Sequence, residues 1–275
     1  MVLFNQAAIV GTGLIGGSIG MALKKNHICR KVLGVSFHKK SIGLAKRKKA
    51  IDCGSQNLQI IKDADLVILA TPVEQILKLA PQIAGIIKKD CIMIDVGSTK
   101  EGIVAKLEKI FPNYIGTHPL AGSEKRGILN ARDDLFKNSL CLLTPTRNTA
   151  VFVRKKIEEL WLHLGARVFF LSPDKHDEAL SFISHLPHIA AFALISVIPG
   201  KFLNFASSGL KDTTRIAASD NELWADIFLN NQKNLLRAID EFQAKTSLIK
   251  QAIKKKNKKL LNKILAEAKS KREAL

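Results

Sequence analysis

The sequence has few cysteines, and their spacing limits the class of protein it can encode. Its four cysteines, Cys29, Cys53, Cys91 and Cys141, form no Cys-x-x-Cys pair and have no histidine at a spacing suited to zinc. The pattern argues against a disulfide framework and predicts no bound metal. It is typical of a reducing compartment, so we expect a cytoplasmic protein.

Acidic residues are also scarce: 24 Asp and Glu stand against 43 Lys and Arg, a net charge of +19. Residues 245–275 contribute 11 Lys and Arg against 2 Asp and Glu, or +9 of that charge. A basic tail is compatible with a solvated helix face, a nucleic acid or an anionic surface. Apolar residues recur through it at three- and four-residue steps. We therefore predict a helix that covers a domain or joins two subunits, and no nucleic-acid partner.

A secretory leader is lacking as well, because the uncharged residues 1–23 have no basic start, no cleavage pattern and five interrupting glycines. Residues 179–200 are long enough to span a bilayer but contain His185, Pro187 and His188. We predict a buried helix there and no membrane partner.

Up to about residue 170 the chain alternates short apolar runs with amphipathic stretches, which favours an α/β fold with a parallel sheet covered on both faces. From Ser172, a potential helix cap followed by Pro173, only helical patterns remain. We predict an α/β domain over residues 1–171 and an all-α helical domain over 172–275. The expected strands cover 7–11, 32–35, 66–71, 91–97, 114–118, 139–145 and 166–171, and the expected helices include 74–87, 100–110, 173–198, 201–218, 221–244 and 246–273.

A glycine motif follows the first strand directly. In a dinucleotide fold Gly11 permits the tight turn, Gly13 lets a pyrophosphate approach the backbone, and Gly16 allows close helix–strand packing. The helix that follows offers its N–H groups to the phosphates. The alternative is a glycine-rich packing turn. The expected cofactor-binding residues are Gly11, Thr12, Gly13, Leu14, Ile15 and Gly16.

The end of the second strand distinguishes NAD from NADP. An acidic residue there binds the ribose 2′-hydroxyl of NAD, but this chain has Ser36, followed shortly by Lys39 and Lys40. These groups suit a 2′-phosphate, so we favour NADP over NAD. The two lysines could instead simply begin a solvated helix.

Two later strand ends carry candidate catalytic side chains. His118 lies between a strand and a loop with glycine and proline, where it could accept a proton near neutral pH. Ser98 could hydrogen-bond the substrate or the nicotinamide, or cap a helix that starts near Thr99.

In the helical half, His185 and His188 are three residues apart, but no third ligand suggests a metal. His185 is compatible with a satisfied core histidine. Arg215 could bind a carboxylate with two hydrogen bonds, and Trp224 is by default a core or interface aromatic.

Five segments in order resemble the prephenate and arogenate dehydrogenase family of tyrosine biosynthesis, over nearly the whole chain. They are VGTGLIGGSIG (10–20), DVGSTK (95–100), GTHPLAGSE (116–124), HDEALSFISHLPH (176–188) and KDTTRIAASDNELWADIF (211–228).

The resemblance implies an NAD(P)-dependent oxidative decarboxylation of a cyclohexadienol by a homodimer. It implies that residues 1–171 form a Rossmann-type dinucleotide-binding domain and residues 172–275 an all-α helical substrate and dimerisation domain. It implies that His118 accepts the proton of the ring hydroxyl and that Ser98 orients that hydroxyl and His118. Arg215 would pair with a substrate carboxylate and His188 would help hold the substrate, while Glu124 and Trp224 would line the site entrance. The chain length implies a stand-alone dehydrogenase without a fused mutase or regulatory domain.

Two rival classes share parts of these patterns. A two-domain NADP enzyme of the 3-hydroxyacid dehydrogenase or pyrroline-carboxylate reductase type has the glycine turn and a helical second domain, but does not predict GTHP together with SHLPH. A non-catalytic dinucleotide-binding sensor is the other alternative.

Overall fold

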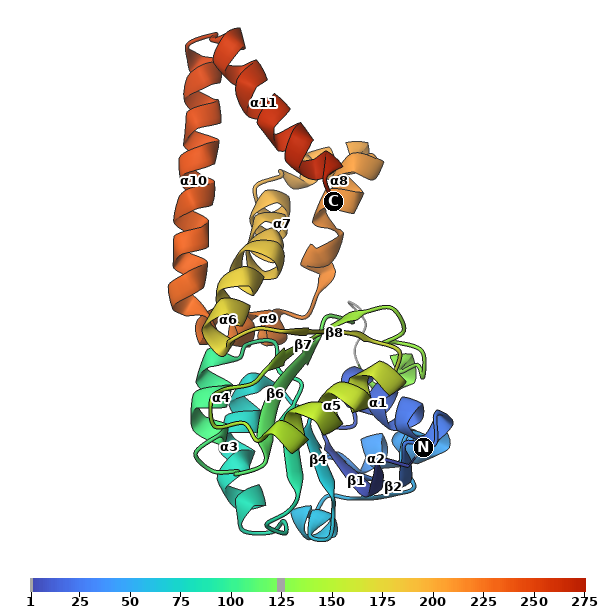
Figure 1. The fold of residues 1–275 in the computed structure, drawn as a ribbon. Helices are drawn as coiled ribbons and strands as arrows, with labels where there is room; N and C mark the ends of the chain where they lie inside the picture. Colours follow the sequence, from blue (N-terminus) through green and yellow to red (C-terminus); the bar gives the residue numbers. More distant parts are fainter. Residues whose placement is uncertain (1, 123–126) are drawn as a thin grey trace.

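The computed structural model describes residues 2–122 and 127–275, which form an eight-stranded sheet with helices on both faces and a helical part standing on one edge of that sheet (Figure 1). The strand order is β3-β2-β1-β4-β5-β6-β7-β8. The strands are β1 (Phe4–Val10), β2 (Cys29–Val35), β3 (Cys53–Ser55), β4 (Leu66–Leu69), β5 (Ile92–Asp95), β6 (Tyr114–Pro119), β7 (Leu140–Thr144) and β8 (Arg167–Phe170).

The order of the first six strands is that of a dinucleotide-binding sheet, with parallel pairing from β3 through β6. The expected fully parallel sheet is wrong at one pair, because β7 runs antiparallel to β6, with His118 opposite Leu142. β7 is covered on both faces like its parallel neighbours, so it has the same continuous apolar sequence. Its antiparallel direction therefore could not be predicted from that sequence. β3 was not predicted, because its three residues contain no apolar run.

Helices cover both faces of the sheet. One face packs against α1 (Leu14–Lys25), α2 (Lys39–Arg47) and α5 (Val151–His163), and the other against α3 (Val73–Ala84) and α4 (Glu101–Leu107). Since the parallel strands all end at the same edge, the loops after β1, β4, β5 and β6 gather beneath the helical part.

From Pro173 onward the described chain is helical. The predicted long helices are divided more often than expected, because Asn231 has a non-helical backbone and Lys256 a φ of 51°. Asn257 then caps the last helix by accepting a hydrogen bond from the backbone N–H of Leu260. The α-helices are α6 (Pro173–Leu180), α7 (Leu186–Ser196), α8 (Ser208–Thr214), α9 (Asn221–Asn230), α10 (Gln232–Lys254) and α11 (Lys258–Glu273), with a π-helical segment at Ser181–His185 and 3₁₀ segments at Gly200–Phe205 and Arg215–Ala218.

The apolar helical stretch Pro173–Ser196 is less covered than the sequence predicts. By length and composition this stretch could cross a bilayer. An 18-residue window within it has a mean hydropathy of 1.5, and 22% of that window is buried. Within α7 itself only Ala191 is buried, whereas Val197 just beyond the helix is 73% exposed. The prediction of a buried helix is therefore wrong for a single chain.

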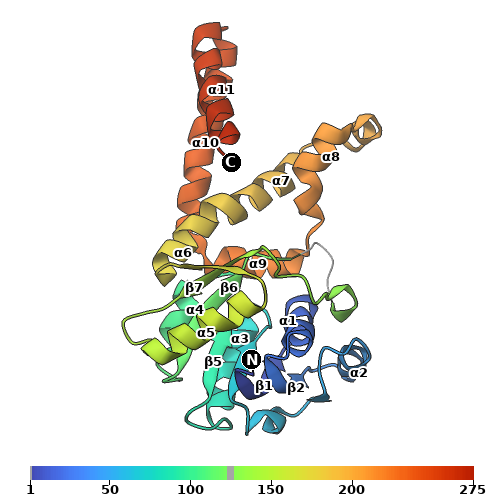
Figure 2. The same cartoon turned by 45° about the vertical axis from the view of Figure 1, so that its right-hand side comes forward.

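The two last helices form an antiparallel hairpin that projects away from the sheet (Figure 2). Ile264 and Ala252 are buried between α10 and α11, but Ile253 and Leu265 remain 60% and 53% exposed. Only some residues of the predicted apolar stripe are therefore buried within the hairpin, and the others remain exposed.

Candidate active site

A cleft of about 720 Å³ lies where the helical part meets the carboxyl ends of the strands. Residues from the loops after β1, β4, β5 and β6 form one wall, and residues from the stretch 180–188 and from 215–227 form the other. The cleft therefore exists only because both parts of the chain contribute to it.

The glycine turn forms one end of this cleft and fits a dinucleotide. Gly11 has a φ of 102°, and a Cβ there would lie 2.5 Å from the carbonyl oxygen of Ala70. A Cβ on Gly16 would lie 2.0 Å from the carbonyl oxygen of Gly11, so these two glycines are required by packing. A Cβ on Gly13 would meet no atom within 4 Å, and Gly13 lines the cleft at the start of α1. This leaves open backbone at a helix N-terminus, as a pyrophosphate requires.

Two buried hydroxyls near this turn lack a hydrogen-bond partner among the described residues. They are Oγ1 of Thr12 in the turn and Oγ1 of Thr71, which follows β4 and lines the cleft. Buried polar groups are normally paired, so the Thr71 hydroxyl at the cleft fits a ligand that supplies the missing partner. At the end of β2, Ser36 is half-buried, and Lys39 and Lys40 are exposed at the N-terminus of α2.

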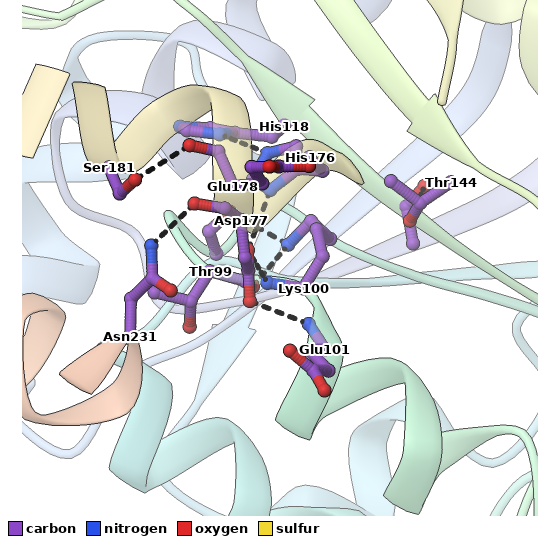
Figure 3. Close-up of polar contacts among 12 residues, drawn as sticks. Thr99, Lys100, Glu101, His118, Thr144, His176, Asp177, Glu178, Ser181 and Asn231 are labelled. Carbon is purple, nitrogen blue, oxygen red and sulfur yellow. Dashed lines mark hydrogen bonds and ion pairs between the residues drawn. The ribbon is translucent and has the colours of Figure 1, made fainter. Parts of the chain in front are cut away.

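The histidine of the β6 end stands in a hydrogen-bonded chain that we call the Asp–His–His triad: Asp177, His176 and His118 (Figure 3). Nδ1 of His118 lies 2.9 Å from Nε2 of His176, and Nδ1 of His176 lies 2.7 Å from Oδ1 of Asp177. His118 lines the cleft, whereas His176 and Asp177, both on α6, are buried behind it.

The surroundings of His118 keep it neutral. Burial lowers its pKa well below the ordinary histidine value, and the nearby His176, Lys100 and His185 lower the pKa further. A neutral imidazole is the form that can accept a proton, so His118 has the protonation state that a base requires.

A fully buried ion pair supports the loop that carries Ser98. Nζ of Lys100 donates to Oδ2 of Asp95 at 2.6 Å and to the carbonyl oxygen of Gly97 at 2.7 Å. The hydroxyl of Tyr114 donates to the other oxygen of Asp95 at 2.7 Å. These bonds fix the turn at residues 97–99 so that Ser98 faces the cleft.

The alternative role of Ser98 as a helix cap is not what the structure shows. α4 begins at Glu101, with Lys100 at the capping position. Its first N–H groups are bound instead by Asp177 of the helical part, which accepts from Lys100 N at 2.7 Å and from Glu101 N at 2.9 Å. A carboxylate at a helix N-terminus is favourable for the helix dipole.

The helical wall of the cleft carries aromatic and cationic groups. The His188 ring stacks on Trp224 with centroids 3.4 Å apart, and Arg215 lies near enough to lower the pKa of His188 in addition to the larger effect of burial. His185 is buried, and its Nδ1 lies 3.1 Å from the side-chain nitrogen of Asn231, which also donates to the carbonyl oxygen of Asp177. Since an amide nitrogen donates, Nδ1 of His185 accepts and its Nε2 carries the hydrogen.

The structure brings most of the predicted site residues into one place. Glu124 lies outside the described residues. Gly11, Thr12 and Gly16 shape the glycine turn without lining the cleft, and Ser36, Lys39 and Lys40 lie apart at the end of β2. Lining the cleft are Gly13, Leu14, Ile15, Ser98, His118, His188, Arg215 and Trp224.

Sequence reasoning assigned no role to His176, Asp177, Lys100 or Asn231. His176 and Asp177 stand in the first turns of a helix that begins at a Ser-Pro pair, but their partners in the site lie about 60 to 80 positions away in the chain. Among residues 2–122 and 127–275, no group of three or more His, Cys, Asp or Glu side chains is placed to hold a metal ion.

Comparisons with known proteins agree with the two-part structure. Residues 19–170 match the family model described as prephenate dehydrogenase, nucleotide-binding domain, and residues 172–267 match prephenate dehydrogenase, dimerization domain. A prephenate dehydrogenase of Bacillus subtilis is 33% identical over 97% of this chain and 75% of its own length. A cyclohexadienyl dehydrogenase of Zymomonas mobilis is 35% identical over 92% of this chain and 90% of its own length.

A solved structure is similar over the same extent. The crystal structure of prephenate dehydrogenase from Aquifex aeolicus, in complex with hydroxyphenyl propionate and NAD⁺, superimposes with a TM-score of 0.93 at 33% identity and covers 98% of both chains.

Proposed function

The chain belongs to the prephenate dehydrogenase family, and from that premise we propose how its residues carry out the reaction, which dinucleotide it prefers and how it assembles. The enzyme is an oxidoreductase of tyrosine biosynthesis. It converts prephenate or arogenate to 4-hydroxyphenylpyruvate or tyrosine by oxidative decarboxylation. A bound nicotinamide dinucleotide supplies the hydride acceptor.

His118 is the catalytic base of this proposal. Its neutral ring faces the cleft and accepts the proton of the substrate hydroxyl through Nε2, because Nδ1 is occupied by His176. The ring carbon that carries this oxygen gives up a hydride, the ring carboxylate leaves as CO₂, and the ring becomes aromatic. The oxygen stays on the ring as the phenol oxygen. Aromatisation is strongly favourable, so one well-placed base suffices even though its pKa is lowered. Ser98 stands on the supported loop beside it and orients the hydroxyl.

The substrate carries two carboxylates, or one carboxylate and an amino acid group, and needs cationic partners. Arg215 offers a planar guanidinium able to bind a carboxylate with two hydrogen bonds. His188, held against Trp224, forms the adjoining wall. We assign these residues to substrate binding, with Glu124 at the site entrance as the sequence predicts.

NADP is the preferred dinucleotide of this proposal. Ser36 at the end of β2 leaves room for a 2′-phosphate, and Lys39 and Lys40 stand exposed in the first turn of α2. Replacing Ser36 by aspartate should shift the preference at least about tenfold toward NAD, because a carboxylate pairs with a free 2′-hydroxyl and repels a phosphate. A Ser55→Asp variant, on the neighbouring strand β3, is the control.

We also propose a cytoplasmic homodimer, with residues 1–171 as the dinucleotide-binding domain and 172–275 as the helical domain that joins the subunits. The exposed apolar surface of α7 and the incomplete packing of the α10–α11 hairpin support it. Partner helices from a second copy would cover both.

The observation that carries the proposal is the meeting of the glycine turn, His118 and Arg215 in one cleft. Purified protein should reduce NADP, and NAD more slowly, when supplied with prephenate or arogenate. His118→Asn should lower kcat by about 100-fold or more, the contribution expected of a general base, and should still bind NADP. His163→Asn, on the exposed face of α5, is the matched control and should have wild-type activity. Absence of turnover with either substrate from protein that binds NADP would overturn the assignment of the reaction.

A further inference from the structure

The hydrogen-bond geometry behind His118 determines which of its two ring nitrogens carries the N–H hydrogen. The chain of bonds begins at Asp177, whose Oδ1 accepts from Lys100 N and whose Oδ2 accepts from Glu101 N. Burial raises the pKa of this carboxyl above its ordinary value, but both of its oxygens accept N–H bonds, so we assign it the ionised form. An ionised carboxylate can only accept.

The donor in the next bond must therefore be His176. Its Nδ1 lies 2.7 Å from Oδ1 of Asp177 and carries a hydrogen. Burial lowers the pKa of His176 to about 2, so the ring is neutral and its Nε2 is a bare acceptor. The 2.9 Å contact between that atom and Nδ1 of His118 needs one hydrogen, which only His118 can supply.

We propose that Asp177 and His176 are positioning residues that keep the hydrogen of His118 on Nδ1, so that Nε2 is the bare nitrogen presented to the substrate hydroxyl. The inference rests on the proposed function, in which His118 is the base. When His118 accepts the substrate proton, its Nδ1–H still donates to His176. The negative charge of Asp177 then stabilises the new imidazolium through the intervening ring.

The triad crosses between the two parts of the chain. His118 belongs to β6, while His176 and Asp177 belong to α6 of the helical part (Figure 3). Of the groups facing His118, Lys100 comes from the loop before α4 and His185 from the π-helical segment, and both disfavour its protonation. The base is thus completed by residues of the helical part.

Asp177→Asn tests the assignment. An amide nitrogen at the Oδ1 position loses the bond from Lys100 N and donates to His176 Nδ1. That moves the His176 hydrogen to Nε2 and, in turn, the His118 hydrogen to its own Nε2. We expect kcat to fall by about 100-fold with KM within about threefold of wild type, because the base is lost and the binding groups remain. Asp174→Asn, an exposed aspartate on the same helix, should leave both constants unchanged.

A second measurement shows directly which ring nitrogen of His118 carries the hydrogen. Long-range ¹H–¹⁵N spectra of the histidine rings should show Nδ1–H for His118 in the wild type and Nε2–H in Asp177→Asn. A His118 hydrogen on Nε2 in the wild type, or an unchanged tautomer and kcat in the variant, would overturn the inference. The spectra do not depend on turnover, so failure of the proposed reaction and failure of the triad are separately visible.

A second pair of variants covers the case in which Asp177→Asn does not fold. The side-chain oxygen of glutamine in His176→Gln can still accept from His118 Nδ1, whereas leucine in His176→Leu cannot. We expect the glutamine variant to keep at least about tenfold more of kcat than the leucine variant, although leucine is the better side chain for a buried site. Equal activities would contradict the role of His176.

Discussion

Some residues of the cleft are placed by the sequence next to them, whereas others depend on partners far away in the chain. Ser98 follows the end of β5 and His118 lies in the last residues of β6, so a local pattern placed both near the ligand edge. Lys100 looks like an ordinary lysine in the sequence, yet it is fully buried and paired with Asp95. The partners of His176 and Asp177 lie about 60 to 80 residues away, and no local pattern encodes such contacts.

The depressed pKa of His118 predicts the acid side of the pH profile. A group whose pKa is lowered stays neutral until the pH falls below that lowered value. Thus kcat/KM should remain constant as the pH is reduced through 6.5, the ordinary histidine pKa, and fall only at lower pH. Initial rates across pH, with intact fold checked by circular dichroism at each point, measure this. An acid limb centred at or above 6.5 would show that His118 is not held neutral.

Lys100→Met should destabilise the protein strongly. The variant leaves the Asp95 carboxylate buried without its cation, and removing one partner of a buried ion pair costs about 3–5 kcal/mol. Urea unfolding measures the change. Lys106→Met, on the exposed side of α4, is the matched control and should stay within about 0.5 kcal/mol of wild type. Equal effects of the two variants would mean that the pair contributes little.

Helices and strands were predicted correctly where their own sequence is sufficient to define them. Buried apolar runs identified seven of the strands, and Ser172-Pro173 marked the start of α6. Elements set by tertiary contacts were missed: the antiparallel direction of β7, the end of α9 at Asn231, and the π-helical segment before Pro187. Asn231 leaves the helical conformation where its side chain bonds Asp177 and His185.

The turn between β1 and α1 offers a test in which stability and binding separate. Ala at Gly16 would force its Cβ onto the carbonyl oxygen of Gly11, so Gly16→Ala should lower the free energy of unfolding by about 1–3 kcal/mol. Gly13→Ala meets no protein atom, so it should fold within about 1 kcal/mol of wild type. It should nevertheless bind NADP at least about tenfold more weakly, because the methyl group fills the space of the pyrophosphate. Urea unfolding and NADP titration compare the two variants, and full affinity in Gly13→Ala would place the phosphates elsewhere.

At the scale of the whole molecule, apolar surface is concentrated on the helical part. Val197 and Phe205, which follow α7, are 73% and 82% exposed. Large exposed apolar patches mark interaction surfaces, and the family model for this part is a dimerization domain. Hydropathy alone predicted burial of this helix, because a sequence pattern cannot tell a core within one chain from a core between two.

Val197→Asp should therefore weaken the dimer. A carboxylate in an apolar interface must lose its water without gaining a partner, so the dissociation constant should rise by about 100-fold or more. Sedimentation equilibrium measures the change. Leu162→Asp, an equally drastic change at an exposed position of α5, should leave the dimer intact. A wild-type dissociation constant in Val197→Asp would place the interface elsewhere.

The contact of Asp177 with the start of α4 also has a consequence for recombination between relatives. The loop at residues 97–101 and the helix that starts at Pro173 are distant in the chain but meet through one carboxylate. A hybrid enzyme that takes its first half from one homologue and its second half from another inherits the base from one parent and the groups that orient it from the other. We therefore expect a hybrid to keep its activity when residues 97–101 and the start of α6 come from the same parent, and crossover points should be chosen accordingly.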